Sequence, residues 1–218
     1  MRASSLHICA LIPTYNNANT ILDIVQRTRK QLKDIIVVVD GCTDNTLDLL
    51  QELEFPITIV SYPKNKGKGH ALKKGFRKAI ELGFEYALTI DSDGQHYPED
   101  IPLLIDAIKK HPGSMIIGSR KLTSENVPGK NKFANKFSNF WFRLQTHINL
   151  PDTQTGFRIY PLNKLYGLSL LTSRYEAELL LLVLAAWRNV PLLPVDIRVY
   201  YPPQEERVSH FRPGLDFT

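Results

Sequence analysis

The sequence predicts a single α/β domain built on a mainly parallel β-sheet, and three observations support this prediction. Short apolar runs rich in β-branched residues alternate with longer segments whose apolar residues recur at helical spacing. Polar loops that contain aspartate or asparagine follow three of these runs. The chain of 218 residues, 43% hydrophobic and 22% charged, is also large enough for one globular domain with its own core.

The first part of the chain alternates regularly between strands and helices. We expect strands over residues 7–12, 35–39, 57–62 and 86–90. We expect helices between them over residues 19–32, 46–53 and 69–82. Asp44 can cap the second of these helices. Units of strand, helix and strand in this order form right-handed crossovers, which predicts a parallel sheet.

Three polar loops lie at the carboxyl ends of predicted strands, over residues 13–17, 40–44 and 91–96. Parallel strands end at the same edge of their sheet, and ligands bind outside that edge. The sequence therefore predicts a ligand site where these three loops converge.

The second part of the chain is less regular. We expect helices from residue 98 to about 110, over 137–147 and over 175–189, and strands over 115–118, 155–160 and 195–200. Residues 121–139 are polar and rich in lysine and asparagine, and we expect a mobile segment near the site there. Residues 202–218 form a polar, basic tail with no expected element.

Charge and cysteine usage bound the function only loosely. A formal net charge of +5 favours an anionic partner, such as a nucleotide, a phospholipid surface or a nucleic acid. Cys9 and Cys42 have no CxxC or Cys/His spacing, which argues against a zinc site or a disulfide framework and fits a reducing cytoplasm.

The longest apolar stretch, residues 179–187, is too short to cross a bilayer, and the N-terminus lacks the apolar core of a signal peptide. Any membrane association is therefore expected to be peripheral.

The strongest chemical signal is the segment Asp-Ser-Asp-Gly-Gln-His, in which Asp91 and Asp93 follow a predicted buried strand. Gly94 permits a sharp turn there, and carboxylate oxygens suit Mg²⁺ or Mn²⁺. Such an ion would neutralise the charge on a departing nucleoside diphosphate. In isolation, an aspartate-rich turn more often only caps a helix. The position after a parallel strand, beside Gln95 and His96, favours a metal site.

Five motifs together resemble those of inverting nucleotide-sugar glycosyltransferases of family 2 with the GT-A fold, closest to the dolichol-phosphate and polyprenyl-phosphate mannosyl- and glucosyltransferases. They are Ile-Pro-Thr-Tyr-Asn-Asn at 12–17, Val-Val-Asp-Gly-Cys-Thr-Asp-Asn-Thr at 38–46, Asn-Lys-Gly-Lys-Gly-His-Ala at 65–71, Asp-Ser-Asp-Gly-Gln-His at 91–96 and Asp-Thr-Gln-Thr-Gly-Phe-Arg at 152–158. The resemblance implies a three-layer α/β sandwich formed by one domain over residues 1–218. It implies a donor-binding half at about 1–118 and an acceptor-side half at about 119–218.

The same resemblance implies roles for residues on the donor side. Metal ligands would be Asp91, Asp93 and Gln95. Residues that contact the donor would be Pro13, Tyr15, Asn17, Asp40, Lys68 and Ser92, with Asp40 accepting a hydrogen bond from the base. Simpler interpretations stay open: Pro13 as a strand terminator, Asp40 as a turn former, Lys68 as a solvated side chain, and Gln95 as a brace for its loop.

On the acceptor side the resemblance points to Asp152 and Gln154. Asp152 is the best candidate for a general base if the acceptor is a hydroxyl, whereas a phosphate acceptor is already anionic and needs no base. Asp152 can equally close a loop after Pro151. Together with Arg120, these two residues and the Asp91–Asp93 pair form the expected catalytic set.

Several charged residues can bind phosphate or support the site. Arg120, Arg158 and Arg207 have the guanidinium fork that matches phosphate oxygens, and Arg120 is the best placed of the three. His210 lies in the basic tail and can join the metal or be merely exposed. Glu176 and Glu178 begin an apolar helix, where capping is the simplest role, although one of them can orient a lysine or arginine.

Two departures from the family concern the acceptor. The glycine-rich, arginine-bearing segment expected after Arg120 is replaced by Asn-Val-Pro-Gly-Lys-Asn-Lys-Phe at 126–133, and the membrane-anchoring helices of some relatives are missing. The aromatic and basic stretch over residues 130–143 can rest on an anionic membrane surface. Packing of its aromatic rings into the core is the simpler account for most of them.

We therefore expect a metal-dependent inverting transfer of mannose or glucose from GDP- or UDP-hexose to a polyprenyl phosphate or another lipid, at the cytoplasmic face of a membrane. The main alternative is transfer to a sugar hydroxyl in polysaccharide or glycolipid synthesis. A nucleotidyltransferase is less favoured because Pro13-Thr-Tyr-Asn-Asn is not a glycine-rich phosphate loop. A nucleic-acid-binding module is suggested only by charge, and we expect no nucleic-acid partner.

Overall fold

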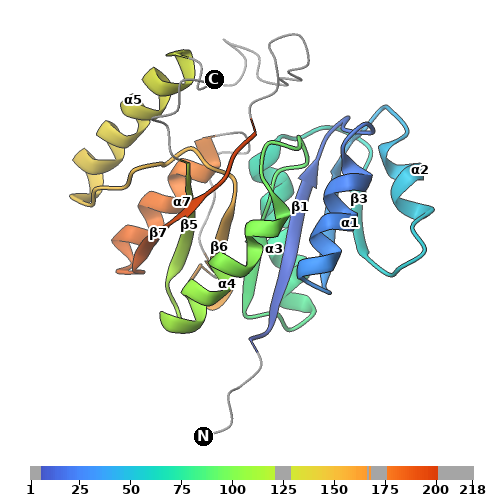
Figure 1. The fold of residues 1–218 in the computed structure, drawn as a ribbon, viewed down its shortest axis with the longest axis horizontal. Coiled ribbons are helices and arrows are strands. Elements are labelled where there is room, and N and C mark those ends of the chain that lie inside the picture. Colours follow the sequence, from blue (N-terminus) through green and yellow to red (C-terminus); the bar gives the residue numbers. More distant parts are fainter. Residues whose placement is uncertain (1–5, 121–128, 166, 168–175, 201–218) are drawn as a thin grey trace, which may run out of the picture.

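The computed structural model describes residues 6–120, 129–165, 167 and 176–200, which form one β-sheet with helices on both faces (Figure 1). The strands are β1 (Ile8–Thr14), β2 (Ile35–Asp40), β3 (Thr58–Tyr62), β4 (Tyr86–Thr89), β5 (Met115–Arg120), β6 (Arg158–Pro161) and β7 (Leu192–Ile197). The helices are α1 (Ile21–Gln31), α2 (Thr46–Gln51), α3 (Lys68–Glu81), α4 (Ile101–Lys110), α5 (Gly129–Thr146), α6 (Leu162–Leu165) and α7 (Glu176–Trp187), with a short 3₁₀ turn η1 (Pro98–Asp100). The expected α/β class with a mainly parallel sheet is confirmed.

The strand order of the sheet is β3-β2-β1-β4-β6-β5-β7. Strands β1 to β4 pair in parallel, as do β5 and β7, whereas β6 is antiparallel to both of its neighbours. The chain runs outward from β1 through β2 to β3 and then returns to place β4 on the other side of β1. The loops after β1 and β4 therefore flank the point where the strand order reverses, the usual ligand crevice of such sheets.

Apolar side chains from the two faces of the sheet form separate clusters with different helices. On one face, β1, β2 and β4 pack against α1, α2 and α4. On the other face, the first strands pack against α3 and the later strands against α5, α6 and α7. Every residue of β2 is buried, as its unbroken β-branched run predicts for a strand covered on both sides.

Differences from the sequence prediction concentrate in the second half. Helix α5 begins at Gly129, so residues 129–139, expected to be mobile, are helical. Strand β7 begins at Leu192, three residues before the expected start. Pro13 does not end β1: it lies inside the strand, opposite Val38 of β2.

The aromatic rings of α5 were expected mostly in the core, and this is wrong for several of them. Phe142 is buried, whereas Phe137, Phe140 and Trp141 are exposed. No helix among the described residues combines the length and apolar character that a membrane span requires.

The packing of α3 on β1 predicts a stability difference between two leucines. Leu11 is fully buried, and Gly75 of α3 approaches it so closely that an added Cβ would lie 2.2 Å from its Cδ1. Leu11→Ala is therefore expected to lower the free energy of unfolding by about 2–5 kcal/mol. The matched control Leu103→Ala removes an exposed side chain and is expected to cost less than about 0.5 kcal/mol. Denaturant unfolding measures both, and equal costs would contradict the packing described.

Candidate active site

The loops after β1 and β4 are joined at the point where the strand order reverses. Asn17 donates from Nδ2 to Ser92 Oγ at 2.9 Å, and Thr20 donates from Oγ1 to the Ser92 carbonyl at 2.6 Å. Ser92 Oγ in turn lies 3.1 Å from the carbonyl of Pro13, to which it donates. Ser92 is buried, so its contacts fix the turn between the two aspartates.

The loop after β2 joins the loop after β1. Asn16 donates from Nδ2 to Thr43 Oγ1 at 3.1 Å, and the Thr43 amide donates to Asn16 Oδ1 at 2.8 Å. The Ala18 amide donates to Asp44 Oδ2 at 3.2 Å. The predicted convergence of the three loops is therefore confirmed.

Asp40 connects this cluster to the loop that precedes α3. Its two carboxylate oxygens accept hydrogen bonds from the amides of Lys66 and Gly67, at 2.8 and 2.9 Å, and the side chain is buried. Gly41 has φ +64°, and a Cβ there would lie 2.3 Å from the Asn65 amide nitrogen. Asp40 thus holds the loop that leads to Lys68, a role beyond the simple turn former considered from sequence.

Lys68 is at the centre of the site. Its ammonium lies 2.6 Å from Asp91 Oδ1 and 2.8 Å from Glu178 Oε2. Burial alone would lower the pKa of Lys68, but the two carboxylates outweigh burial and raise it. The same ammonium keeps the pKa of Asp91 below its usual range, against the effect of burial. The solvated lysine considered from sequence is therefore wrong, and Glu178 does orient a lysine.

Gly156 provides the space that Asp91 occupies. A Cβ built on Gly156 would lie 2.3 Å from Asp91 Oδ2, far closer than van der Waals contact allows. A side chain at position 156 would displace the carboxylate. Residue-by-residue reasoning missed this role, because the glycine stood out only as part of the Thr-Gly-Phe-Arg motif.

Asp93 lies on the exposed side of the same turn. Gly94 takes φ +79°, and the Gln95 amide donates to Asp93 Oδ1 at 3.0 Å. Partial desolvation of the carboxylate and then the negative charge of Asp91 raise the pKa of Asp93 to about 6. Two like charges held on one turn attract a cation between them.

These residues fit a divalent metal ion. The carboxylates of Asp91 and Asp93, and the side-chain amide of Gln95 two residues further on, are hard-oxygen groups of the kind that Mg²⁺ and Mn²⁺ prefer. Within the described part of the chain, no group of three or more His, Cys, Asp and Glu side chains is arranged to hold a metal. A cation here would therefore rely on the two aspartates, an amide and ligands from the substrate.

His96 is buried behind the turn. Its ring lies 5.4 Å from that of Phe157, and within the described part of the chain no group hydrogen-bonds to its Nδ1. Burial lowers the pKa of His96 to about 4, so its imidazole is neutral near pH 7. The histidine thus contributes a neutral ring to the packing beneath the turn.

The acceptor-side motif is organised around Asp152, which is fully buried. Arg120 donates to it from Nε at 2.6 Å and from Nη2 at 2.9 Å, forming a bidentate ion pair. Asn135 of α5 donates to Asp152 Oδ1 at 2.6 Å, and the Gln154 amide donates to the same atom at 3.0 Å. Burial opposes ionisation, but the contacts with Arg120 keep the pKa of Asp152 below its usual range. Asp152 is therefore arranged as an anchor and is poorly suited to act as a base.

Arg158, proposed from sequence as a phosphate ligand, has a structural role instead. It is fully buried, and its guanidinium donates to the carbonyls of Glu178 and Thr153 at 2.9 and 2.8 Å and to Tyr160 Oη at 3.3 Å. These bonds fix the start of α7, where Glu178 meets Lys68. Arg158 thus supports the site indirectly, by holding the helix that carries Glu178.

The other predicted residues lie as follows. Pro13 is buried in β1, and Tyr15 is half-buried at the end of that strand. Arg207 and His210 lie outside the described residues. The amide of Tyr200 donates to the Gln95 carbonyl at 2.8 Å, so the described chain comes close to the Asp91–Asp93 turn at this residue.

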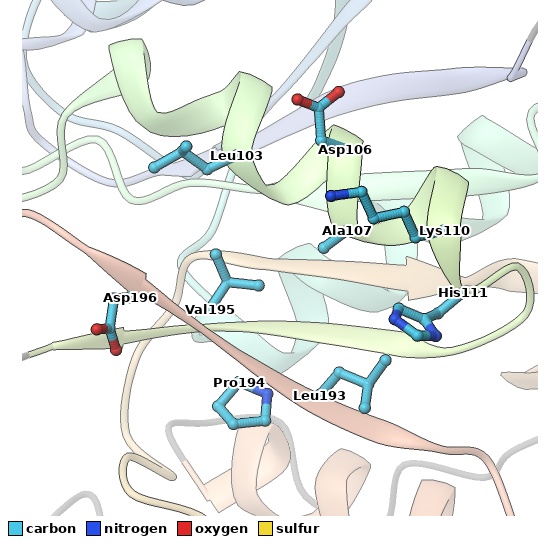
Figure 2. A pocket seen from close by; sticks show the side chains of 9 residues that line it. All are labelled: Leu103, Asp106, Ala107, Lys110, His111, Leu193, Pro194, Val195 and Asp196. Atoms are coloured by element: carbon cyan, nitrogen blue, oxygen red, sulfur yellow. The ribbon is translucent and has the colours of Figure 1, made fainter.

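A separate hollow lies between α4 and the edge strand β7 (Figure 2). Leu103, Ala107, Leu193 and Val195 line it, with charged Asp106, Lys110 and Asp196 among its other lining residues. None of the residues predicted for the site lines this hollow. The predicted residues that gather at the edge where the three loops meet are thus separate from this hollow.

Comparison with known proteins finds relatives of one family. Residues 9–166 match the sequence profile of Glycosyl transferase family 2. A UDP-N-acetylglucosamine–dolichyl-phosphate N-acetylglucosaminyltransferase of Methanococcus voltae is 32% identical over 215 residues, covering 89% of this chain and 86% of that protein. An undecaprenyl-phosphate mannosyltransferase of Micrococcus luteus is 30% identical over 173 residues, covering 76% of this chain and 70% of that protein.

Among solved structures, glucosyl-3-phosphoglycerate synthase from Mycobacterium tuberculosis, in complex with Mn²⁺, UDP and glucosyl-3-phosphoglycerate, superposes with a TM-score of 0.70 at 19% sequence identity. The match covers 93% of this chain and 75% of that one. At this identity the likeness establishes the shared GT-A fold.

The bonds around Asp152 predict a pH-dependent stability. Asp152→Asn removes the buried carboxylate from its bidentate ion pair with Arg120 and is expected to lower the free energy of unfolding by about 3–5 kcal/mol at neutral pH. A carboxylate whose pKa falls on folding stabilises the protein above its ordinary pKa of about 4 and loses that contribution as the pH drops. The difference between wild type and variant should therefore shrink in acid.

Denaturant unfolding at several pH values measures this difference. Asp106→Asn is the matched control, because the Asp106 side chain is 67% exposed, and it should change stability by less than about 0.5 kcal/mol. A loss of less than about 1 kcal/mol for Asp152→Asn would contradict the anchoring role.

Proposed function

The chain belongs to glycosyl transferase family 2, and from that membership we propose that it transfers a hexose, with inversion and with the help of a divalent metal, from a nucleoside diphosphate-sugar to a polyprenyl phosphate. That it is a glycosyltransferase follows from the family and its named relatives. The observation that carries the proposal is the turn with Asp91 and Asp93, placed where the strand order reverses and joined to Lys68. The nucleotidyltransferase and the nucleic-acid-binding module are superseded by this membership.

The donor would lie across the loops after β1, β2 and β4. In this arrangement Pro13, Tyr15 and Asn17 would border the nucleoside, and Lys68 would place a positive charge near the diphosphate. Asp40 already uses both carboxylate oxygens to hold the Lys66–Gly67 amides. A contact between Asp40 and the base would therefore use the remaining lone pairs of a carboxylate that is already fixed in place.

Asp91, Asp93 and Gln95 would hold Mn²⁺ or Mg²⁺ against the donor. Such an ion, when bound, supplies charge neutralisation for the departing diphosphate. Lys68 and the buried guanidinium of Arg158 together balance Asp91 and Glu178, and Asp93 then adds one unbalanced negative charge when ionised. This surplus of negative charge supports a requirement for a cation.

The state of Asp152 favours a phosphate acceptor over a hydroxyl. A hydroxyl acceptor needs a base to take its proton, whereas a phosphate oxygen is already anionic near neutral pH. Asp152 was the best base candidate, and its bonds to Arg120, Asn135 and Gln154 keep it ionised and weakly basic. The names of the relatives, which act on dolichyl phosphate and undecaprenyl phosphate, support the same choice.

In the proposed reaction, an acceptor phosphate oxygen attacks the anomeric carbon from the face opposite the diphosphate. The new bond between carbon and oxygen forms as the bond to the diphosphate breaks, and its electron pair leaves with the nucleoside diphosphate. One displacement inverts the anomeric configuration. We place this reaction at the cytoplasmic face of a membrane, where nucleotide-sugars and the lipid phosphate can meet.

Binding linkage provides the test of the donor site. Manganese with the correct nucleoside diphosphate, at about one hundred times the dissociation constant, should add about 2.7 kcal/mol of stability and raise the melting temperature by about 5–11 °C. A thermal-shift screen of GDP, UDP and their mannose, glucose and N-acetylglucosamine conjugates, with and without manganese, identifies the donor.

Asp93→Ala should abolish this shift, because it removes one of the two carboxylates that would hold the metal. Asp106→Ala, which removes an exposed carboxylate on α4, should leave the shift unchanged. A shift that is equally large without metal, or in Asp93→Ala, would rule out the metal-assisted donor site. No shift with any nucleotide would rule out the proposed donor.

A further inference from the structure

A surface helix usually turns its apolar side chains toward the protein. Helix α5 differs, because most of the side chains on its inner side are polar. Asn135, Ser138, Asn139 and Phe142 follow one another at helical spacing along its inner side. Asn135 donates to Asp152, and Ser138 Oγ lies 2.7 Å from Thr153 Oγ1. Asn139 donates to the Pro151 carbonyl at 2.8 Å and accepts from the Thr153 amide at 3.0 Å. Hydrogen bonds to the 151–153 loop therefore fix the orientation of the helix.

The opposite side of α5 carries large apolar side chains in solvent. Phe137, Phe140, Trp141 and Leu144 recur at the same helical spacing and are 42–60% exposed, and we call this set the α5 aromatic face. Phe140 and Leu144 also line a shallow hollow with Arg143 and His147. Helix α5 lies at the outer end of the molecule, beyond β5 and α7 (Figure 1).

A second helix extends this apolar surface. Trp187 at the end of α7 is 62% exposed, and its indole Nε1 donates to the Gln145 carbonyl of α5 at 3.2 Å. Contiguous exposed aromatic rings of this kind are uncommon on a surface that faces only water, and they mark interaction sites.

The charge of α5 indicates which partner the α5 aromatic face fits. The sequence of Gly129–Thr146 contains four basic residues and no acidic residue. Lys136 and Arg143 are exposed, and their spacing of seven residues places them along one flank of the apolar stripe. Aromatic rings bordered by lysine and arginine are typical of helices that lie in the headgroup region of an anionic bilayer.

We propose that the α5 aromatic face, with its flank of Lys136 and Arg143, docks the enzyme on an anionic lipid bilayer. The inference rests on the proposed function, since a polyprenyl phosphate must be taken from a membrane. Each apolar ring gains free energy on entering the acyl boundary, while each basic side chain is attracted to anionic headgroups.

The inner side of α5 connects the proposed docking surface to the acceptor-side loop. Asn135 joins the helix directly to Asp152, and Asp152 holds Arg120. A bilayer against the outer side of α5 therefore lies one helix away from the acceptor-side loop. The docked helix would thus hold the acceptor-side loop about 10 Å, one helix diameter, from the bilayer surface.

Vesicle co-sedimentation of the full chain tests the proposal. Phosphatidylcholine vesicles with phosphatidylglycerol should bind the wild type at low salt, and pure phosphatidylcholine should bind it more weakly. Phe140→Ser with Trp141→Ser should reduce binding to the anionic vesicles by about tenfold or more. The matched control, Leu82→Ser with Leu103→Ser, changes two exposed leucines on other helix ends and should bind as the wild type does.

A charge pair separates the electrostatic contribution. Lys136→Glu with Arg143→Glu should reduce binding to anionic vesicles by about tenfold or more and leave the weak binding to neutral vesicles unchanged. Lys109→Glu with Lys110→Glu makes the same change in net charge on α4 and should retain most of the binding. Melting temperatures close to that of the wild type confirm that each variant is folded.

The outcomes separate this proposal from the proposed function. Wild type that stays in the supernatant at low salt, yet transfers sugar to a short-chain, water-soluble polyprenyl phosphate, overturns the docking surface alone. If the wild type binds vesicles, the α5 variants do not, and the wild type transfers no sugar to lipid phosphates, the docking surface is supported and the proposed function is overturned. A wild-type dimer in sedimentation that Phe140→Ser with Trp141→Ser makes monomeric would assign the face to a second copy and overturn the proposal.

Discussion

The arrangement of the site depends on one shared cation, the ammonium of Lys68. It joins three segments that are distant in the sequence: the start of α3, the turn after β4 and the start of α7. Asp40 positions the loop before it, Gly156 leaves room for the carboxylate that it binds, and Arg158 fixes the helix that supplies Glu178. Lys68 and the buried Arg158 together balance Asp91 and Glu178, so the unbalanced negative charge of the cluster is that of Asp93 when it is ionised, and that charge is the physical reason to expect a metal ion.

Much of the donor half could be predicted from the sequence. Regular alternation of strands and helices identified β1 to β4, and the rule for parallel sheets placed their loops at one edge, as the contacts of Asn17 with Ser92 and of Asn16 with Thr43 confirm. Periodicity could not identify the antiparallel insertion of β6 between β4 and β5, since strand direction leaves no mark on the sequence of a four-residue strand. It also gave no sign that Asp40 binds backbone amides or that Asn135 reaches Asp152 from α5, because such pairings arise only in the folded chain.

The largest error of the sequence prediction, the aromatic rings of α5, is also informative. Apolar residues at helical spacing normally mark the buried side of a helix. Here the buried side carries Asn135, Ser138 and Asn139, which hydrogen-bond to the 151–153 loop, and the helix therefore turns most of its aromatic rings outward. The polar inner side and the apolar outer side thus have one explanation, in which the helix connects the acceptor-side loop to a bilayer.

The central claim is sugar transfer to a phosphate at the turn that holds Asp91 and Asp93. Its most direct test is to supply the donor identified by thermal shift with manganese and two matched lipids, a polyprenyl phosphate and the corresponding polyprenol, and to determine the product and its anomeric configuration by NMR. The account predicts a sugar joined through phosphate to the lipid, with the configuration inverted relative to the donor, and no product from the polyprenol. Transfer to the polyprenol hydroxyl, or retention of configuration, would contradict it.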